Sequence, residues 1–150
     1  MRIILQRVSE ASVLIDGVIK GQIEIGLLLL LGIEENDSKE DVEWLIQKIN
    51  AMRIFNDAHG KMNFSIQDVN GAYLVISQFT LFASTKKGNR PSFIKAARPE
   101  KAIPLYEYFI EQLKIKSNLN VQNGEFGADM KISLINDGPV TILIDSKNKE

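Results

Sequence analysis

The segment 136–141, Asn-Asp-Gly-Pro-Val-Thr, constrains the fold most, because it places a Gly-Pro pair between the apolar runs 132–135 and 140–144. Proline has no N–H to donate to a strand ladder. An Asp-Gly pair between apolar runs favours a hairpin, but the proline after it restricts the glycine to extended geometry and spoils a two-residue turn. Because Gly and Pro are also ordinary turn residues, the pattern is compatible with an unusual hairpin and with a purpose other than turning the chain.

Composition indicates one domain and removes several kinds of site. The chain has 150 residues, of which 45% are hydrophobic, enough to bury a substantial core in a single domain spanning 1–150. It has no cysteine, which excludes disulfides and thiolate chemistry and fits a reducing cytosol. The one histidine, His59, lies in a polar turn and is expected on the surface rather than in a catalytic triad. We therefore expect no metal and no other cofactor.

The N-terminus and the apolar runs predict a soluble protein without a membrane association. Residues 1–7 are too short and too interrupted by charge for a signal peptide, and no run is long enough to span a bilayer. The longest apolar run, 27–31, lies between glycines and is typical of a buried strand. We expect a cytoplasmic location.

Hydrophobic periodicity predicts two helices among many strands. Ser38 offers an N-cap, with Asp41 in a short-armed capping box, for a helix that ends near Met52. Apolar residues after Pro104 recur at helical spacing and predict a second helix. We place Pro104 in the first turn of this helix, where its missing N–H is harmless. The expected strands are 2–8, 11–16, 18–25, 27–33, 53–55, 61–66, 72–79, 119–122, 131–136 and 140–144.

This order of elements predicts an α+β fold. Most strands are adjacent in sequence, so mainly antiparallel and mixed sheets are expected, in a layered β/β/α domain with the two main helices covering one face. The tail from about Ser146 is expected to fray.

Charge is distributed unevenly although the net charge is only −1. Residues 1–75 carry 7 basic and 11 acidic side chains, whereas residues 76–150 carry 11 and 8. Six basic side chains lie between Lys86 and Lys101 against the single acidic Glu100, within a polar stretch that we expect to be a loop. Such a loop is either a phosphate-facing patch or simply solvated.

Polar side chains gather where the apolar strand 72–79 ends. With strand periodicity, Gln78 and Thr80 share one face while Ser77 and Phe79 share the other. A Thr80 nucleophile would need an activating base, and no histidine or lysine is close in sequence. The alternative is that Ser77 and Thr80 only satisfy backbone groups where the strand ends.

Seven segments taken together are far more specific than any one of them. The chain resembles the D-aminoacyl-tRNA deacylases of the D-Tyr-tRNA deacylase type, from Met1 to about Asp145. Ser84 and Pro104 depart from that family's pattern without touching its motifs. The segments that carry the resemblance occur in the order 6–8 (QRV), 53–55 (RIF), 60–63 (GKMN), 77–81 (SQFTL), 87–93 (KGNRPSF), 126–130 (FGADM) and 136–141 (NDGPVT).

The resemblance implies a homodimeric cytosolic esterase that removes D-amino acids, and glycine as well, from tRNA as a proofreading step. It implies active sites at the subunit interface, where a cis Gly138-Pro139 pair enters the partner's pocket as a chirality gate, supported by Arg7. Its rigid carbonyls would reject an L side chain by collision. The residues implied in the pocket itself are Gln78, Phe79 and Thr80 as catalytic residues, and Ser77, Ala128 and Met130 as substrate-binding residues, with segment 126–130 completing the wall.

An aminoacyl ester is already activated, so positioning and oxyanion donors such as the N–H groups of Phe79 and Thr80 would suffice, helped by the neighbouring 2′-hydroxyl of the terminal adenosine. Lys86, Lys87 and Arg90 would face the acceptor end of the tRNA.

Two other interpretations compete with this one. A small metal-dependent hydrolase is disfavoured by the single histidine, and a non-catalytic RNA-binding or dimerisation module is permitted by composition.

Overall fold

Two long antiparallel strands organise the fold. The computed structural model describes residues 1–150 of the chain. β1 (Arg2–Ile15) pairs with β8 (Lys131–Asp145) from Arg2↔Asp145 to Leu14↔Lys131. The two segments that the sequence suggests as separate strands before and after Gly138-Pro139 therefore belong to one strand with one partner. The hairpin interpretation of this segment is wrong, because the chain continues along β1 instead of turning back.

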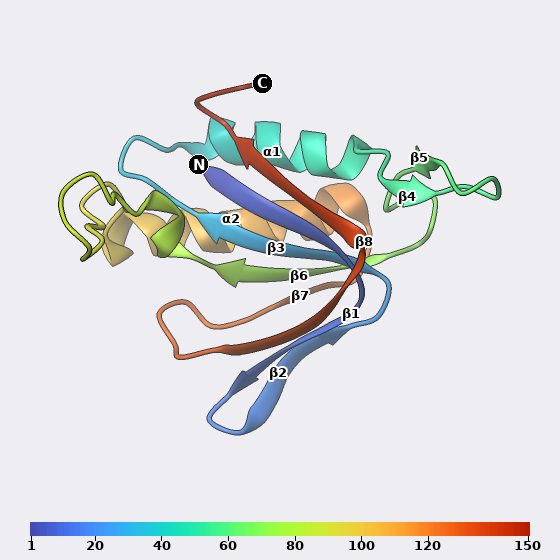
Figure 1. Cartoon of the computed structure of the whole chain (residues 1–150), viewed down its shortest axis with the longest axis horizontal. Coiled ribbons are helices and arrows are strands. Elements are labelled where there is room, and N and C mark those ends of the chain that lie inside the picture. Colours follow the sequence, from blue (N-terminus) through green and yellow to red (C-terminus); the bar gives the residue numbers. More distant parts are fainter.

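The main sheet has six strands, with the order β2-β1-β3-β6-β7 and with β8 paired to β1. β1 also pairs antiparallel with β2 and β3, whereas β6 runs parallel to both of its neighbours, β3 and β7. The sheet curls so that β2 and the first half of β8 lie below β7 in Figure 1. The bounds of the remaining strands are β2 (Val18–Ile23), β3 (Gly26–Gly32), β6 (Ala72–Ser77) and β7 (Val121–Asn123).

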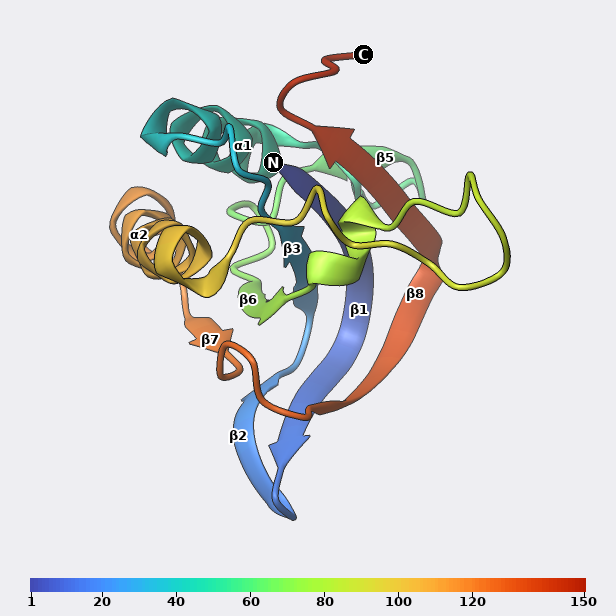
Figure 2. The same cartoon turned by 90° about the vertical axis from the view of Figure 1, so that its left-hand side faces the viewer.

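Two helices cover one face of this sheet, α1 (Lys39–Ala51) and α2 (Pro99–Ser117), as Figure 2 shows from the side. Between helices and sheet lies a hydrophobic cluster of 24 buried residues, and a second cluster of 8 fills the inside of the curl. A small hairpin of β4 (Phe55–Asn56) and β5 (Met62–Phe64) lies apart from the main sheet. The expected α+β class with both helices on one face is confirmed, and its two β layers come from one curled sheet.

The first helix follows the sequence prediction closely. It begins after Ser38, and the Asp41 carboxylate accepts the Ser38 N–H at 2.9 Å, as a capping box requires. The second helix begins earlier than expected. Pro99 occupies its first turn, so Pro104 lies inside the helix and not in the first turn. Pro104 is exposed, which lets the helix continue past it although the Glu100 carbonyl loses its intrahelical donor.

The tail also differs from expectation at its first residues. Ser146 is buried, its N–H donates to the Met1 carbonyl at 2.9 Å, and its hydroxyl accepts a bond from the Met1 ammonium at 2.9 Å. Lys147 pairs with Asp41 at 2.8 Å. Contacts with the N-terminus and α1 therefore hold the chain beyond Asp145. No helix of the structure combines the length and the apolar character that a membrane span requires.

Candidate active site

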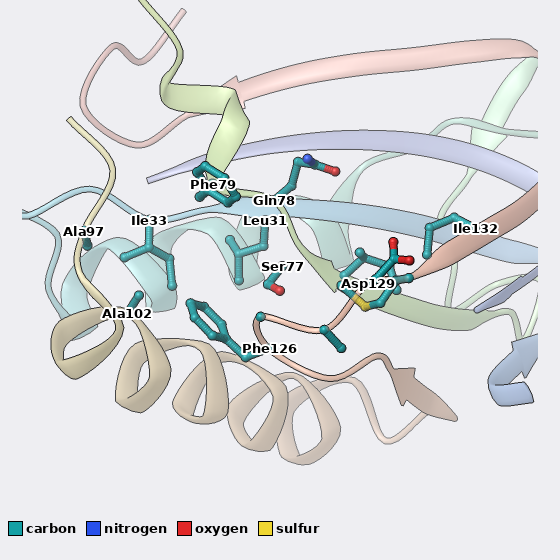
Figure 3. A pocket seen from close by; sticks show the side chains of 14 residues that line it. Leu31, Ile33, Ser77, Gln78, Phe79, Ala97, Ala102, Phe126, Asp129 and Ile132 are labelled. Carbon is teal, nitrogen blue, oxygen red and sulfur yellow. The ribbon is translucent and has the colours of Figure 1, made fainter. Parts of the chain in front are cut away.

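A cavity of about 300 Å³ opens where the parallel strands β3 and β6 end. In Figure 3, Phe79 lies above Ser77 and Phe126 lies below it, on the side of α2. The lining is mostly apolar, and its one charged side chain is Asp129. The lining residues are Leu31, Ile33, Ile76, Ser77, Gln78, Phe79, Ala97, Ala102, Phe126, Gly127, Ala128, Asp129, Met130 and Ile132.

The turn after β6 shapes one edge of this cavity. Strand β6 ends at Ser77, which lies opposite Leu31, and a short 3-10 helix, η1 (Phe79–Phe82), follows. The expected alternation of Gln78 and Thr80 on one strand face is therefore wrong, because the chain is no longer extended there. A glycine at position 32 permits this close turn, since a Cβ at Gly32 would lie 3.0 Å from the Gln78 carbonyl oxygen.

Two backbone donors are free at this turn. The N–H of Gln78 donates to the Leu31 carbonyl at 2.8 Å, but those of Phe79 and Thr80 donate to no protein acceptor. Phe79 is 55% exposed and its ring packs edge-on against Phe93, 5.1 Å between centroids. The Thr80 hydroxyl accepts a bond from the Gln78 carboxamide at 2.6 Å and has no base as a partner. The site thus offers amide donors but no activated nucleophile.

The opposite wall comes from the segment after β7 and from α2. The Phe126 ring packs on the Tyr106 ring with 5.8 Å between centroids, and the Tyr106 hydroxyl donates to the Val75 carbonyl at 3.1 Å. Burial raises the pKa of Tyr106, so its phenol stays protonated and holds the wall to the sheet. The segment 83–98, which carries the cluster of basic side chains, is called the basic loop below. At the cavity rim, the Ala97 N–H donates to the Ile33 carbonyl at 2.9 Å, which brings the end of the basic loop to the cavity.

The Gly-Pro pair forms a bulge on β8, residues 137–140, away from this cavity. Asn136 pairs with Val8 and Thr141 with Gln6, so four residues of β8 lie opposite the single residue Arg7. Both Gly138 and Pro139 are exposed, and the peptide bond between them is cis. A Cβ at Gly138 would lie 3.0 Å from Arg7 Nη2, at φ +145°, so only glycine fits there without strain.

Arg7 holds this bulge from the inside of the molecule. Its Nε donates to the Asp137 carbonyl at 2.7 Å, and Nη1 donates to the Ile54 carbonyl at 2.6 Å and to the Asn56 side chain at 3.2 Å. The guanidinium therefore ties the bulge to the segment that enters β4.

The basic loop leaves the cavity rim and projects from the molecule in both Figure 1 and Figure 2. Its base is closed by two backbone hydrogen bonds between Ser84 and Ser92, of 2.7 and 2.9 Å. Lys86, Lys87 and Arg90 are all exposed between these two residues and form no ion pair within the chain.

Comparison with known proteins decides the family. The family model described as D-Tyr-tRNA(Tyr) deacylase matches residues 4–145. The chain belongs to the D-Tyr-tRNA(Tyr) deacylase family. A protein of Akkermansia muciniphila named D-aminoacyl-tRNA deacylase is 62% identical, and one of Bacteroides fragilis with the same name is 61% identical, each over 100% of both chains. The expectation of an enzyme of this deacylase family is therefore confirmed.

Solved structures share this fold. A structure titled c-Myc DNA Unwinding Element Binding Protein superposes with a TM-score of 0.90 at 38% identity, covering 97% of this chain and 98% of that one. A probable eukaryotic D-amino acid tRNA deacylase gives a TM-score of 0.79 at 16% identity over 95% and 97% of the two chains, which supports the fold alone.

The deacylase structure brings together only part of the predicted site. Ser77, Gln78, Phe79, Ala128 and Met130 line the cavity, with Thr80 next to it in η1. Arg7, Gly138 and Pro139 meet each other at the bulge and do not line the cavity of their own chain, and Lys86, Lys87 and Arg90 lie on the loop beyond its rim. Sequence reasoning placed segment 126–130, and Asp129 with it, in the wall, but it missed Leu31, Ile33, Ile76, Ala97, Ala102 and Ile132 as lining residues.

Proposed function

We propose that this family member hydrolyses the ester bond of D-aminoacyl-tRNA, releasing tRNA and the D-amino acid, and rejects L-aminoacyl-tRNA. It would act as one domain in the cytoplasm, as a proofreading enzyme. The observation that carries the proposal is the pair of free N–H groups of Phe79 and Thr80 at the edge of an apolar cavity that holds no nucleophile paired with a base. The names of the relatives at about 60% identity support the substrate class.

An activated ester suits this sparse site. Attack on the ester carbonyl places negative charge on its oxygen, and two preorganised N–H donors stabilise that charge without reorganising. The substrate's own 2′-hydroxyl would assist the attacking water, in a cavity that is lined by neither histidine nor lysine. Ser77, Ala128 and Met130 would bind the terminal adenosine and the ester in the cavity.

The Gly138-Pro139 pair would act as a chirality gate in the cavity of a second copy of this chain. The bulge is exposed on β8, whose outer edge pairs with no strand along its 15 residues. On either side of the bulge, Ile135 is 54% exposed and Leu143 is 64% exposed. An unpaired edge with exposed apolar side chains favours association, and a twofold dimer would exchange the two bulges symmetrically.

Such a gate would read handedness with backbone atoms. The exposed bulge would lie against the substrate Cα, where an L side chain collides with it and a D side chain points away. Because no side chain pocket is involved, hydrolysis should extend to many D-amino acids. It should also extend to glycyl-tRNA, since glycine has no Cβ to reject.

The loop bearing Lys86, Lys87 and Arg90 would contact the phosphates at the acceptor end of the tRNA. Its end is held at the cavity rim by the Ala97–Ile33 hydrogen bond, so a tRNA whose 3′ end enters the cavity passes this loop. Exposed basic side chains on a projecting loop bind a polyanion through its phosphates, and the affinity of this binding falls as the salt concentration rises.

One experiment separates this proposal from the alternatives. The protein is incubated with D-tyrosyl-tRNA and L-tyrosyl-tRNA, before and after exhaustive chelation, and the released amino acid is followed. Rapid release from the D ester alone, unchanged by chelation, is the expected result. Loss of release after chelation would point to a metal-dependent hydrolase, and no release from either ester would favour a non-catalytic RNA-binding module.

A further inference from the structure

The carboxamide of Asn136 closes the base of the β8 bulge. Its Oδ1 accepts the Val140 N–H at 2.7 Å, while Nδ2 donates to the Thr141 hydroxyl at 2.9 Å and to the Val140 carbonyl at 3.3 Å. One side chain at the start of the bulge thus binds both polar backbone groups of the residue at its end. Val140 has no partner in β1, so the carboxamide takes the place of the missing strand ladder.

Asn136 and Arg7 hold the two ends of the bulge by different means. Arg7 binds the carbonyl of Asp137 from the buried side at 2.7 Å, and Asn136 binds Val140. Gly138 and Pro139 lie exposed between these two attachment points. Because the Asn136 bonds to Val140 are partly buried, water competes with them only weakly, and their loss would leave the polar groups of Val140 unsatisfied.

We propose that Asn136 is a positioning residue that sets the D-over-L selectivity of the proposed deacylation by fixing the place of the Gly138-Pro139 carbonyls. This inference rests on the proposed function. Steric rejection works only if the rejecting group cannot yield, and displacements of about 1 Å are enough to change reaction rates strongly. Hydrolysis of the D ester depends instead on the N–H groups of Phe79 and Thr80, which Asn136 does not contact.

The test compares Asn136→Ala and Asn136→Asp in the full chain. Asp keeps an oxygen that accepts the Val140 N–H but cannot donate to Val140 or Thr141. The matched control is Asn120→Ala, because the Asn120 carboxamide accepts one exposed hydrogen bond, from Gln122 at 2.9 Å, and precedes β7, a strand that does not pair with β8. Single-turnover rates are measured with D-tyrosyl-tRNA and L-tyrosyl-tRNA, together with the melting temperature of each variant.

Asn136→Ala is expected to hydrolyse the L ester about tenfold faster than the wild type does, with the D rate changed by less than about threefold. Asn136→Asp should lie between, and Asn120→Ala should match the wild type. In addition, the Val140 amide should exchange with solvent faster in both Asn136 variants while amides of the core strands keep their protection.

Equal loss of the D and L rates in parallel with melting temperature would overturn the inference, since Asn136 would then only stabilise the fold. If Asn136→Ala does not fold, a wild-type selectivity in folded Asn136→Asp overturns it equally. A wild-type enzyme without preference for the D ester would refute the proposed function, and the positioning role with it. A selective wild type with equally selective variants would refute the positioning role alone.

Discussion

Arg7 Nε donates to the backbone carbonyl of Asp137 at 2.7 Å, on the strand that bears the exposed bulge. Arg7 is only 5% exposed, and the nearest oxygen of the Asp137 carboxylate is 3.9 Å away. The Nη1 atom of the same guanidinium donates to the Ile54 carbonyl at 2.6 Å. The buried guanidinium of Arg7 is therefore held mainly by hydrogen bonds to carbonyl groups, and less by an ion pair. The guanidinium in turn holds the bulge in place.

Replacement of Arg7 by lysine should damage both stability and selectivity. A single ammonium cannot reproduce the planar fork that reaches two carbonyls at once. We expect the free energy of unfolding to fall by about 2 kcal/mol, and the ratio of D to L hydrolysis to fall with it. Urea unfolding and ester hydrolysis measure the two effects. The control is Arg53→Lys, because Arg53 is exposed and donates to the Asn63 carbonyl at 2.8 Å; equal effects of both substitutions would contradict a specific role of Arg7.

The Thr80 backbone should matter more than its hydroxyl. Thr80→Ala keeps the free N–H, so D-ester hydrolysis should stay within about threefold of the wild type. Replacing the Thr80 amide by a backbone ester removes that donor and should lower the rate about 100-fold or more. Both are measured at saturating substrate. Complete inactivity of Thr80→Ala with intact substrate binding would instead identify the hydroxyl as a nucleophile.

Asp41 should make stability depend on acid pH. Burial alone would raise the pKa of Asp41, but hydrogen bonds from Lys147, Ser146 and Ser38 outweigh it and lower the pKa from 3.8 to about 2. Since the folded pKa is the lower one, the stability that this carboxylate contributes is complete above about pH 4 and is lost as pH falls through about 2. Asp41→Asn should therefore be less stable than the wild type at pH 7, and the difference should shrink towards pH 2.

Urea unfolding at several pH values measures this difference. Glu40→Gln is the control, because Glu40 lies in the same first turn of α1 but is exposed. A stability difference between Asp41→Asn and the wild type that is the same at pH 7 and pH 2 would show that the carboxylate charge contributes nothing.

The basic loop should account for much of the salt dependence of tRNA binding. Replacing Lys86, Lys87 and Arg90 by glutamine should weaken binding and lower the slope of log affinity against log salt by about 1 for each phosphate that a basic side chain no longer neutralises. Filter binding across a salt series measures the slope. An unchanged slope would show that the loop is merely solvated. A matched triple replacement elsewhere on the surface, which should change little, uses the exposed Lys20, Lys61 and Lys114.

Local patterns in the sequence predict most of the fold. The apolar periodicity after Ser38 and the capping partner Asp41 predict α1 with nearly its observed ends, because both signals are local to the helix. The prediction for Pro104 is wrong because a second proline, Pro99, competes for the first turn of α2 and sequence alone does not rank them. The course of β8 through Gly138-Pro139 could not be predicted from local patterns. It depends on β1, which lies more than 100 residues away in the sequence and pairs with β8 both before and after the bulge.

The site is less accessible to sequence reasoning than the fold. Ser77 and Gln78 can be predicted because polar residues at the end of an apolar strand stand out. Ala97 and Ala102 line the same cavity but carry no chemical signal, and only the hydrogen bond from Ala97 to Ile33 and the packing of α2 bring them there. The spatial separation of the bulge from the cavity within one chain is likewise a property of the sheet and not of any motif.

A working site should combine the cavity of one chain with the bulge of a second, and two variants make this testable. Ala128→Trp fills the cavity but leaves the bulge intact. Gly138→Ala displaces the bulge, because a Cβ there would lie 2.7 Å from Val140 Cγ2, but leaves the cavity open. Alone, the first variant should hydrolyse neither ester, and the second should hydrolyse the L ester as well as the D ester.

The decisive measurement is L-tyrosyl-tRNA hydrolysis by Gly138→Ala chains after co-refolding with an excess of Ala128→Trp chains, with mixed dimers verified through distinct affinity tags. Each open cavity in a mixed dimer then receives an intact bulge from its inactive partner. L hydrolysis per Gly138→Ala chain should therefore fall to the wild-type level while D hydrolysis persists. Unchanged L hydrolysis in verified mixed dimers would contradict a site shared between two chains.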